Sequence, residues 1–468
     1  MKIHFNGAAQ TVTGSQFLLE VNGHQILLEC GLYQGHRKDY YQRNRTFGFA
    51  PGKLDAVLLS HAHIDHSGNL PNLVKHGLNA PIYATRATAG LADVMLRDSG
   101  HIQEADVEFL NKKRAKRGEP PVEPPVEPLY TVADAERVSE YFKPVEYNQT
   151  IEPVPGVQVT FVDAGHILGS AAIVLDIDEH GRKYRFWFSG DIGRDRLPLM
   201  NDPVLPGAAD YLMMECTYGD KPHEDPEVAY VELRDALRRA VERRGKIIIP
   251  SFAVGRTQEL IYYFNQMMSA GEVPVIPVYV DSPLAVETSR VFMKYADLFD
   301  TEAQEFVRSG QHPALAFPQL TYIESVDQSK ALNDQHEPMI IISASGMAET
   351  GRILHHLRNN IQNSKNMVLI VSWQAPHTLG RRLADREAMV RIFGDPYDRR
   401  AEVVTIGGLS AHAGQTMLLK YAKATQTSLR DLYLVHGEED AATVFMGLLT
   451  QHGFTNIHYP GWGQILEI

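Results

Sequence analysis

Short apolar runs separated by polar turns dominate residues 1–200. Runs rich in β-branched and aromatic residues predict strands at Gln16–Val21, Gln25–Leu28, Ala56–Leu59, Val157–Val162, Ala171–Ile177 and Arg185–Phe188. Between Ala87 and Phe142 the pattern is helical and charged, and prolines within residues 119–128 interrupt it with a stretch that we expect to be extended. The first part of the chain is therefore predicted to consist mainly of β-strands.

From about Val228 the pattern changes to amphipathic helices that alternate with short apolar strands. The predicted strands are Lys246–Pro250, Val275–Val280, Met339–Ser343 and Met367–Val371. This alternation predicts a parallel α/β sheet in a second domain, and 468 residues are enough for two cores. Two later strands, Val403–Ile406 and Leu432–Val435, each end at a loop that carries a histidine. We expect this terminal segment to rejoin the first domain, so that the second domain is an insertion.

The composition is that of an ordinary globular protein, with 44% hydrophobic and 22% charged residues. No apolar run reaches membrane-spanning length, so a membrane protein is not expected. The only two cysteines, Cys30 and Cys216, favour a reducing cytoplasm. A formal charge of -12 argues against coating nucleic acid by bulk electrostatics, although it leaves room for a local site.

The strongest chemical signal is the run Ser60-His61-Ala62-His63-Ile64-Asp65-His66, which directly follows a predicted strand. Imidazole and carboxylate groups are good zinc ligands, and a loop leaving a strand can direct them toward two adjacent metal ions. His166 and Asp191 also follow predicted strands. Alone, His166 could be a buried hydrogen-bonding residue and Asp191 a turn residue. Together with the histidine run they are candidate ligands, and Asp191 could bridge two metals.

In order and spacing, these residues resemble the metallo-β-lactamase superfamily. The resemblance implies an αββα sandwich, two β-sheets between layers of helices. It also implies two zinc ions, one on His61, His63 and His166 and the other on Asp65 and His66, bridged by Asp191. Relatives carry aspartate where this chain has Glu29, a residue that would orient a ligand histidine through a hydrogen bond. Cys30 and Cys216 are expected to be small buried residues, not ligands.

Three segments later in the chain extend the likeness: Met214–Asp220, Leu409–Ala413 and Val435–Glu438. They resemble the β-CASP nucleases, above all the endonuclease subunit of the cleavage and polyadenylation factor and its prokaryotic relatives. The resemblance implies a metallo-β-lactamase domain at residues 1–219 and 396–468, with a parallel α/β β-CASP domain inserted at 220–395. It implies catalytic roles for Asp65, Glu215 and His412, in which Glu215 holds His412 and His412 acts as the general acid. His436 would complete the second zinc site and favours the RNA-processing branch.

Phosphate contacts are predicted at the ends of two strands in the second domain. Ser343, Ser345 and Gly346 follow one strand and precede a helix, so their hydroxyl and N–H groups could hold a phosphate. An ordinary helix cap explains them equally well. Arg256 follows another strand near a turn.

We therefore expect a zinc-dependent ribonuclease that hydrolyses single-stranded RNA by a two-metal mechanism. An endonuclease is favoured over a 5′-exonuclease. The alternatives are a DNA nuclease or small-molecule hydrolase with the same core, and a non-catalytic scaffold subunit of an RNA-processing complex. A homodimer is compatible with the sequence, but no residue pattern specifies one.

Overall fold

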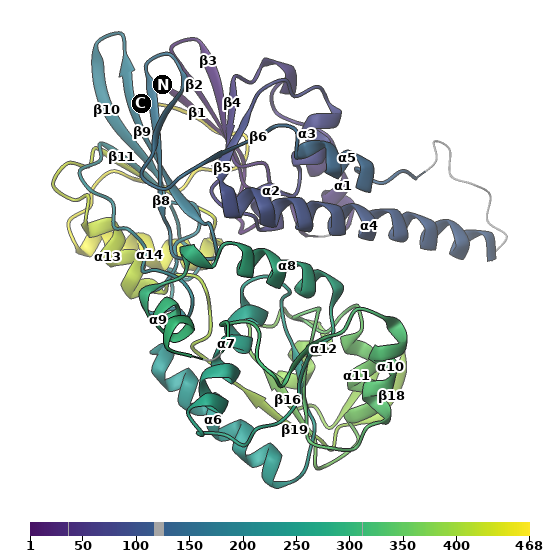
Figure 1. Cartoon of the computed structure of the whole chain (residues 1–468). Helices are drawn as coiled ribbons and strands as arrows, with labels where there is room; N and C mark the ends of the chain where they lie inside the picture. The colour runs from purple at the N-terminus through teal and green to yellow at the C-terminus, as the bar shows by residue number, and fades with distance from the viewer. Residues whose placement is uncertain (36, 117–125, 311) are drawn as a thin grey trace. The chain divides into compact units, whose positions relative to one another are not determined.

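The computed structural model describes residues 1–35, 37–116, 126–310 and 312–468. Most of the predicted extended stretch at 119–128 lies outside these residues. The chain forms two compact units (Figure 1). Unit 1 contains Met1–Asp195, Asp202–Pro222 and His412–Ile468, and unit 2 contains Arg196–Asn201 and His223–Ala411.

Unit 1 is built on two seven-stranded sheets. The first has the order β22-β1-β2-β3-β4-β5-β6 and contains β1 Lys2–Gly7, β2 Gln16–Val21, β3 His24–Leu28, β4 Ala56–Leu58, β5 Ile82–Thr85, β6 Phe142–Val145 and β22 Ile465–Glu467. The second has the order β21-β20-β11-β10-β9-β8-β7 and contains β7 Thr150–Val154, β8 Val157–Asp163, β9 Ala171–Glu179, β10 Arg182–Phe188, β11 Tyr211–Glu215, β20 Asp431–Val435 and β21 Ile457–His458. The predicted strands of this half are present within a few residues of their expected ends.

Alternation along the strands of the second sheet divides its side chains between two apolar cores. In β11, Tyr211 and Met213 belong to the core shared with the first sheet, whereas Leu212 and Met214 belong to the core on the opposite face. The opposite face is covered by α13 Gln415–Lys423 and α14 Glu439–Gln451. Leu418 of α13 belongs to the core on this face. Burial on both faces explains why these strands appear in the sequence as continuous apolar runs.

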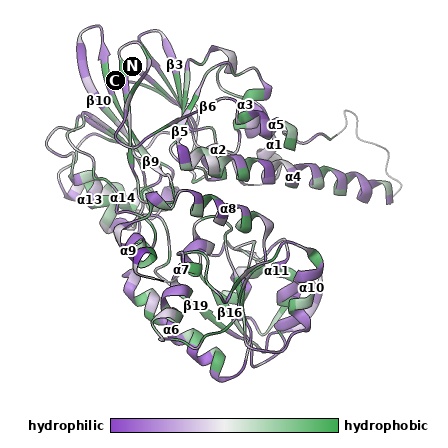
Figure 2. Ribbon diagram, viewed as in Figure 1, coloured by the Kyte–Doolittle hydropathy of each residue, from purple (hydrophilic) through white to green (hydrophobic). Residues whose placement is uncertain are grey.

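The remaining helices of unit 1 lie beside the first sheet (Figure 1). They are α1 Arg37–Arg45, α2 Ile64–Ser67, α3 Leu70–Lys75, α4 Arg86–Lys116 and α5 Val132–Val138, with a 3-10 turn at Pro51–Lys53. Two sheets with helices on both outer sides form the αββα sandwich that the sequence predicts. Hydrophobic residues follow the strands, while much of α4 is hydrophilic (Figure 2).

Unit 2 contains a six-stranded parallel sheet of order β14-β13-β15-β12-β16-β19. Its strands are β12 Ile247–Pro250, β13 Val278–Val280, β14 Leu320–Tyr322, β15 Ile340–Ser343, β16 Met367–Ile370 and β19 Glu402–Thr405, and a hairpin adds β17 Met389–Ile392 and β18 Asp395–Asp398. The helices are α6 Pro226–Glu242, α7 Arg256–Ser269, α8 Pro283–Lys294, α9 Thr301–Ser309, α10 Val326–Asp334, α11 Ile353–Asn360 and α12 Leu379–Ala384, with a 3-10 turn at Ala296–Leu298. This is the inserted parallel α/β domain expected from the sequence.

One strand belongs to a different sheet from the one expected. The sequence predicts Val403–Ile406 within the segment that rejoins the first domain. In the structure β19 pairs in parallel with β16, with Val368 opposite Val403, and the compact units divide after Ala411. Hydrophobic pattern predicts that a strand is buried, but it does not specify which sheet the strand joins. Among the described residues, no helix is both long enough and apolar enough to span a membrane.

Candidate metal centre

The predicted metal ligands lie together at one end of the strands of unit 1. His61 and His63 follow β4, His166 follows β8, Asp191 follows β10, and His436 follows β20. The histidine run is only partly a loop, because Asp65 and His66 lie in the short helix α2. The N–H of Ser67 donates to the carbonyl of His63 at 2.8 Å, so the turn begins directly after the second histidine.

A first cluster joins three histidine rings. His63 Nδ1 lies 3.1 Å from His61 Nε2 and 3.2 Å from His166 Nε2. Asp191 Oδ2 lies 3.4 Å from the same nitrogen of His61 and 3.6 Å from that of His166. Four donor atoms from three separate loops therefore converge on one point.

A second cluster lies on the other side of the same carboxylate. Asp191 Oδ1 is 3.2 Å from His66 Nε2, which in turn is 3.3 Å from His436 Nε2. Asp65 Oδ2 is 3.4 Å from His436 Nε2. Asp191 thus directs one oxygen to each cluster, and its side chain is only 2% exposed. This is the arrangement required of a carboxylate that bridges two metal ions.

Hydrogen bonds at the outer edges of three rings fix which nitrogen faces the clusters. Ser60 Oγ donates to Glu29 Oε2 at 3.0 Å, so it must accept from His61 Nδ1 at 2.9 Å. The same carboxylate oxygen of Glu29 lies 2.7 Å from His66 Nδ1. Nδ1 is thus the donor in each contact, so Nε2 of both rings faces the clusters and carries the lone pair when the ring is neutral.

His436 is held in the same way by a threonine. Thr217 Oγ1 donates to the carbonyl oxygen of His436 at 3.0 Å and lies 3.0 Å from its Nδ1. Because the threonine has a single hydroxyl proton, Nδ1 of the ring must be the donor in the second contact. The Nε2 lone pair of His436 then faces Asp65 and His66.

Two residues of the centre have left-handed backbone conformations that side chains rarely adopt. Glu29 has φ 63 and His436 has φ 48. Glu29 directly follows β3 and His436 directly follows β20. Positive φ in non-glycine residues is uncommon and is often associated with functional sites.

Burial and neighbouring charge separate the pKa values of the ligand groups. Burial lowers the pKa of His61 to about 3 and that of His63 to about 4, and it also lowers the pKa of His166. These rings are therefore neutral at pH 7 and offer lone pairs. Despite burial, contacts with nearby histidines hold the pKa values of Asp65 and Asp191 below their ordinary range, so both carboxylates are ionised.

The candidate general acid lies beside both clusters. His412 Nδ1 is 3.2 Å from Glu215 Oε1 and 3.9 Å from Asp191 Oδ2. Glu215 ends β11 and also accepts from the N–H of Ile192 at 2.7 Å, so its carboxylate is fixed. Burial opposes the charge on His412, but Glu215 and Asp191 outweigh it and raise the pKa of the ring to about 9. A cation bound at Asp191 would offset part of this rise.

The chemistry of the donor set fits metal ions. A tetrahedral ion with bonds of 2.0–2.1 Å to nitrogen separates its ligand atoms by roughly 3.3–3.4 Å, close to the spacings in both clusters. Two polar atoms of the centre, His166 Nδ1 and Asp191 Oδ1, are buried without a hydrogen bond among the described residues. Hydrogen bonding inside the protein therefore leaves Asp191 incompletely satisfied, as expected for a group that binds an ion.

The predicted phosphate contacts in unit 2 differ among themselves. Arg256 is only 7% exposed and forms an ion pair with Glu259, and Ser343 is fully buried and donates to the carbonyl of Asp281 at 2.7 Å. The structure therefore offers neither side chain to a phosphate, because a strand-end position does not tell which way a side chain points. Ser345 is partly exposed, and its Oγ accepts from the N–H of Glu349 at 3.1 Å within a turn, whereas the next helix, α11, begins only at Ile353.

Sequence reasoning missed Ser60 and Thr217. Both lie inside motifs that were recognised, Ser60 directly before His61 and Thr217 two residues after Glu215. Hydroxyl residues are common near strand ends, and only the three-dimensional contacts single out these two. Their position next to candidate ligands was the one available signal.

An αββα sandwich with a buried histidine and carboxylate centre at its strand ends defines the class of metal-dependent hydrolases with the metallo-β-lactamase fold. Family models agree along the chain: a metallo-beta-lactamase superfamily domain matches residues 18–180, a Beta-Casp domain 257–383, and a Zn-dependent metallo-hydrolase RNA specificity domain 396–460.

Several known proteins are similar over nearly the whole chain. Ribonuclease TTHA0252 of Thermus thermophilus is 35% identical over 97% of both chains. Transcription termination factor FttA of Methanocaldococcus jannaschii is 28% identical, with 95% of this chain matching 68% of the relative. A crystal structure titled as a protein of unknown function from Enterococcus faecalis shares the fold with a TM-score of 0.57, at 14% identity over 99% of both chains. The chain belongs to the β-CASP family of the metallo-β-lactamase superfamily, which confirms the resemblance predicted from its motifs.

Proposed function

We propose that this protein is a zinc-dependent ribonuclease that hydrolyses phosphodiester bonds of single-stranded RNA with two metal ions. The observation that carries the proposal is the position of Asp191, which directs one carboxylate oxygen to each of two ligand clusters next to the His412 and Glu215 pair. His61, His63 and His166 would hold one ion with Asp191. Asp65, His66 and His436 would hold the other with the same carboxylate.

Bound metal would supply Lewis acidity toward phosphate oxygens and lower the pKa of bound water. The protein's own groups perform the remaining tasks. Neutral imidazoles present lone pairs because burial holds the pKa values of His61 and His63 low. Ser60, Glu29 and Thr217 keep the rings in the orientation that binding requires.

His412 is proposed to protonate the leaving ribose oxygen. Glu215 accepts a hydrogen bond from Nδ1, so the proton on Nε2 is available to a substrate. The side chain of His412 is 22% exposed, whereas that of Glu215 is fully buried, so the histidine is the member of the pair that substrate can reach. This division of roles is typical of a general acid and the carboxylate that orients it.

RNA is the proposed substrate for two reasons. The relative with 35% identity is named a ribonuclease, and the family model over residues 396–460 describes an RNA specificity domain. His436 lies in the second cluster, where the RNA-processing branch carries histidine.

We favour endonucleolytic cleavage over 5′-exonucleolytic cleavage. Ser345 and Gly346 remain proposed phosphate contacts. The buried free thiols of Cys30 and Cys216 support a cytoplasmic location.

The test is cleavage of a 5′-labelled single-stranded RNA by zinc-loaded enzyme, with zinc content measured on the same preparation. Internal cuts lost in His412→Ala would support an endonuclease, and stepwise 5′ trimming would support an exonuclease. A DNA strand of the same sequence tests the DNA alternative. Intact RNA with two zinc ions bound would overturn the proposal, and a folded protein that binds no metal would favour a scaffold role.

A further inference from the structure

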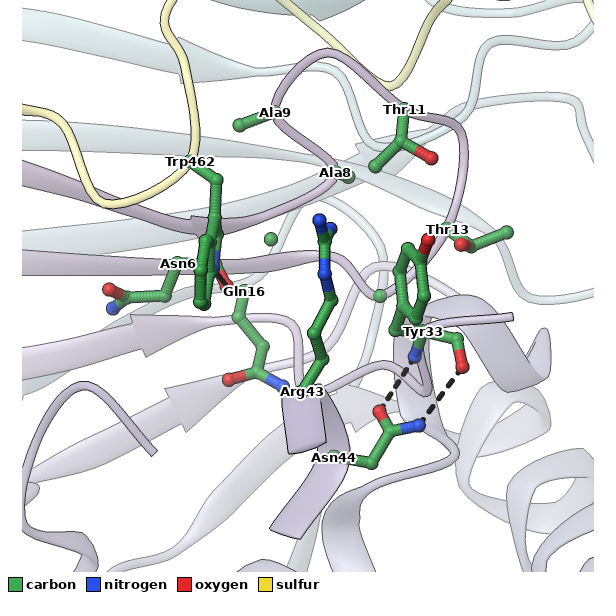
Figure 3. A pocket seen from close by; sticks show the side chains of 12 residues that line it. Asn6, Ala8, Ala9, Thr11, Thr13, Gln16, Tyr33, Arg43, Asn44 and Trp462 are labelled. Carbon is green, nitrogen blue, oxygen red and sulfur yellow. Dashed lines mark hydrogen bonds between the residues drawn. The ribbon is translucent and has the colours of Figure 1, made fainter. Parts of the chain in front are cut away.

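A shallow pocket in unit 1 lies close to the metal centre but contains none of its ligands. Three segments form it: the loop at residues 6–14, the region of Tyr33 and α1, and the loop before β22 that carries Trp462 (Figure 3). Its lining combines backbone and hydroxyl groups with one arginine, Arg43, and two aromatic rings.

Arg43 extends between the two rings. Its guanidinium carbon lies 4.3 Å from the centre of the Tyr33 ring and 5.0 Å from that of Trp462 (Figure 3). Contact with both ring faces holds the guanidinium flat and limits its rotation. An arginine fixed in this way loses little conformational freedom when its N–H groups bind a ligand.

Both rings are themselves anchored. Asn44 accepts a hydrogen bond from the N–H of Tyr33 at 2.8 Å and donates to its carbonyl at 2.9 Å. Trp462 donates from Nε1 to the carbonyl of Asn6 at 2.7 Å, yet the residue is 58% exposed. A tryptophan whose polar atom is satisfied while its ring remains exposed is well suited to stacking.

The charge on Arg43 is unusual in its surroundings. The protein has a formal charge of -12, yet among the described side chains, which do not include Asp39, the contacts of this guanidinium are with the two aromatic rings. Contact with aromatic ring faces does not neutralise the guanidinium, so it keeps its attraction for anions. Arginine is suited to phosphate because its planar fork can donate two parallel hydrogen bonds.

Backbone hydrogen bonds connect the pocket to the second metal cluster. The carbonyl of Ala8, which lines the pocket, accepts from the N–H of His436 at 2.8 Å. The N–H of Ser15, directly after the loop, donates to the carbonyl of Asp65 at 2.8 Å. A polynucleotide cleaved at the metal centre therefore has neighbouring nucleotides within reach of the pocket.

We infer that this pocket is a nucleotide subsite for the RNA strand, in which Arg43 binds a backbone phosphate and Trp462 stacks on a base. The inference rests on the proposed ribonuclease function and adds a specific site of substrate contact to it. Exposed aromatic rings next to cations are the features that bind single-stranded nucleic acid without strict sequence preference.

The experiment compares kcat and KM for a single-stranded RNA oligonucleotide in the metal-loaded wild type, Arg43→Ala and Trp462→Ala. KM should rise about tenfold in each variant, with kcat changing far less, because the lost contact is to a neighbouring nucleotide and not to the reacting phosphate. Arg43→Ala should also reduce the slope of log KM against log salt concentration by about 0.7, as expected for one phosphate contact on a single strand. Trp462→Phe and Arg43→Lys should retain part of the affinity.

A similar arginine and aromatic pair elsewhere supplies the control. Arg358 lies 5.6 Å from the ring of Phe393, which is 51% exposed, and Phe393→Ala should leave KM unchanged. If wild type cleaves RNA and the Arg43 and Trp462 variants keep its KM and salt slope, the subsite inference fails while the ribonuclease proposal stands. If wild type cleaves no RNA, both fail.

RNA substrates with one base removed test the stacking contact directly. Removal of the base that Trp462 contacts should weaken RNA binding by the wild type but not by Trp462→Ala. The effects of base removal and of the substitution on binding should therefore not be additive. Full additivity at every position of the oligonucleotide would overturn the assignment of Trp462 as a base contact.

Discussion

Each unit contains a buried aspartate surrounded by histidine and other polar groups, and the two differ in how completely the protein satisfies them. In unit 2, Asp281 Oδ2 accepts from Ser329 Oγ and lies 2.6 Å from His356 Nε2, and Oδ1 lies 2.6 Å from Arg352 Nη1. In unit 1, both oxygens of Asp191 face ring nitrogens, and Oδ1 has no hydrogen bond to any residue that the structure describes.

This difference distinguishes the structural cluster around Asp281 from the proposed metal-binding cluster around Asp191. The arginine beside Asp281 neutralises the carboxylate, and each of its oxygens accepts at least one hydrogen bond, so the site does not favour an added cation. Around Asp191, by contrast, the buried rings of His61, His63 and His166 are neutral and direct lone pairs inward. Residue types alone do not separate the two clusters, because both combine aspartate and histidine. The direction of donors and acceptors does.

The largest effect is expected from Asp191→Asn. The amide cannot bridge two cations, so we expect loss of at least one metal ion and a fall in RNA turnover of about a thousandfold or more, from the several kcal/mol that a metal contributes. Metal analysis of the purified variant and single-turnover RNA cleavage measure both quantities.

Asp195→Asn is the matched control, because Asp195 forms only a surface ion pair with Lys420 at 3.0 Å and should retain normal activity. Full metal content together with normal cleavage in Asp191→Asn would remove the distinction drawn between the two clusters.

The next largest effect is expected on the stability of unit 2 in Asp281→Asn. Asp281→Asn removes the charge that neutralises Arg352 and should destabilise unit 2 by about 3–5 kcal/mol, the usual cost of breaking a buried ion pair. Hydrogen exchange measured by mass spectrometry on peptides of residues 223–411 reports this locally. The metal content of unit 1 should remain that of the wild type.

Asp327→Asn serves as the control, because Asp327 is exposed and lies 3.9 Å from Lys330, so exchange should hardly change. Unaltered exchange in Asp281→Asn, or a loss of metal from it, would contradict a purely structural role for the cluster.

Much of this picture could be predicted from the sequence, within physical limits. Apolar runs predict the strands within a few residues, and the dense run from His61 to His66 predicts residues that the structure brings together in the candidate metal centre. The sequence does not tell which way a side chain points from a strand end. Phosphate contacts are therefore predicted at Ser343 and Arg256, although Ser343 is buried against the carbonyl of Asp281 and Arg256 is buried in an ion pair with Glu259. Strand partners were equally hidden, as β19 shows.

A smaller effect is expected from Glu29→Gln. Oε2 of Glu29 accepts from Ser60 Oγ and from His66 Nδ1, and Oε1 accepts from the N–H of Ser60. The amide of glutamine has one acceptor oxygen, so it cannot accept all three of these hydrogen bonds. Metal affinity should fall about 10- to 100-fold, as is usual for residues that orient ligands. Titration with a chromophoric chelator measures it.

Glu29→Asp keeps the charge but withdraws the oxygens by about one C–C bond, ~1.5 Å. We expect its affinity to lie between those of wild type and Glu29→Gln. Glu20→Gln, a change on β2 away from the centre, should bind metal normally. Wild-type affinity in Glu29→Gln would show that the orientation of His66 and His61 does not depend on this carboxylate.

The smallest expected effect is a pH dependence confined to unit 2. Burial alone would raise the pKa of Asp281, but hydrogen bonds from His356, Ser329 and Arg352 outweigh it and hold the pKa below the ordinary 3.8. A carboxyl group with a lowered folded-state pKa stabilises the fold above its unfolded pKa, and this contribution disappears as pH falls through the folded-state value. The stability difference between wild type and Asp281→Asn should therefore be constant above about pH 5 and narrow below pH 4.

Hydrogen exchange in unit 2 across this range measures the difference without interference from metal loss in unit 1. A difference that stays constant down to the acid transition would mean that the hydrogen bonds to Asp281 do not favour its ionised form.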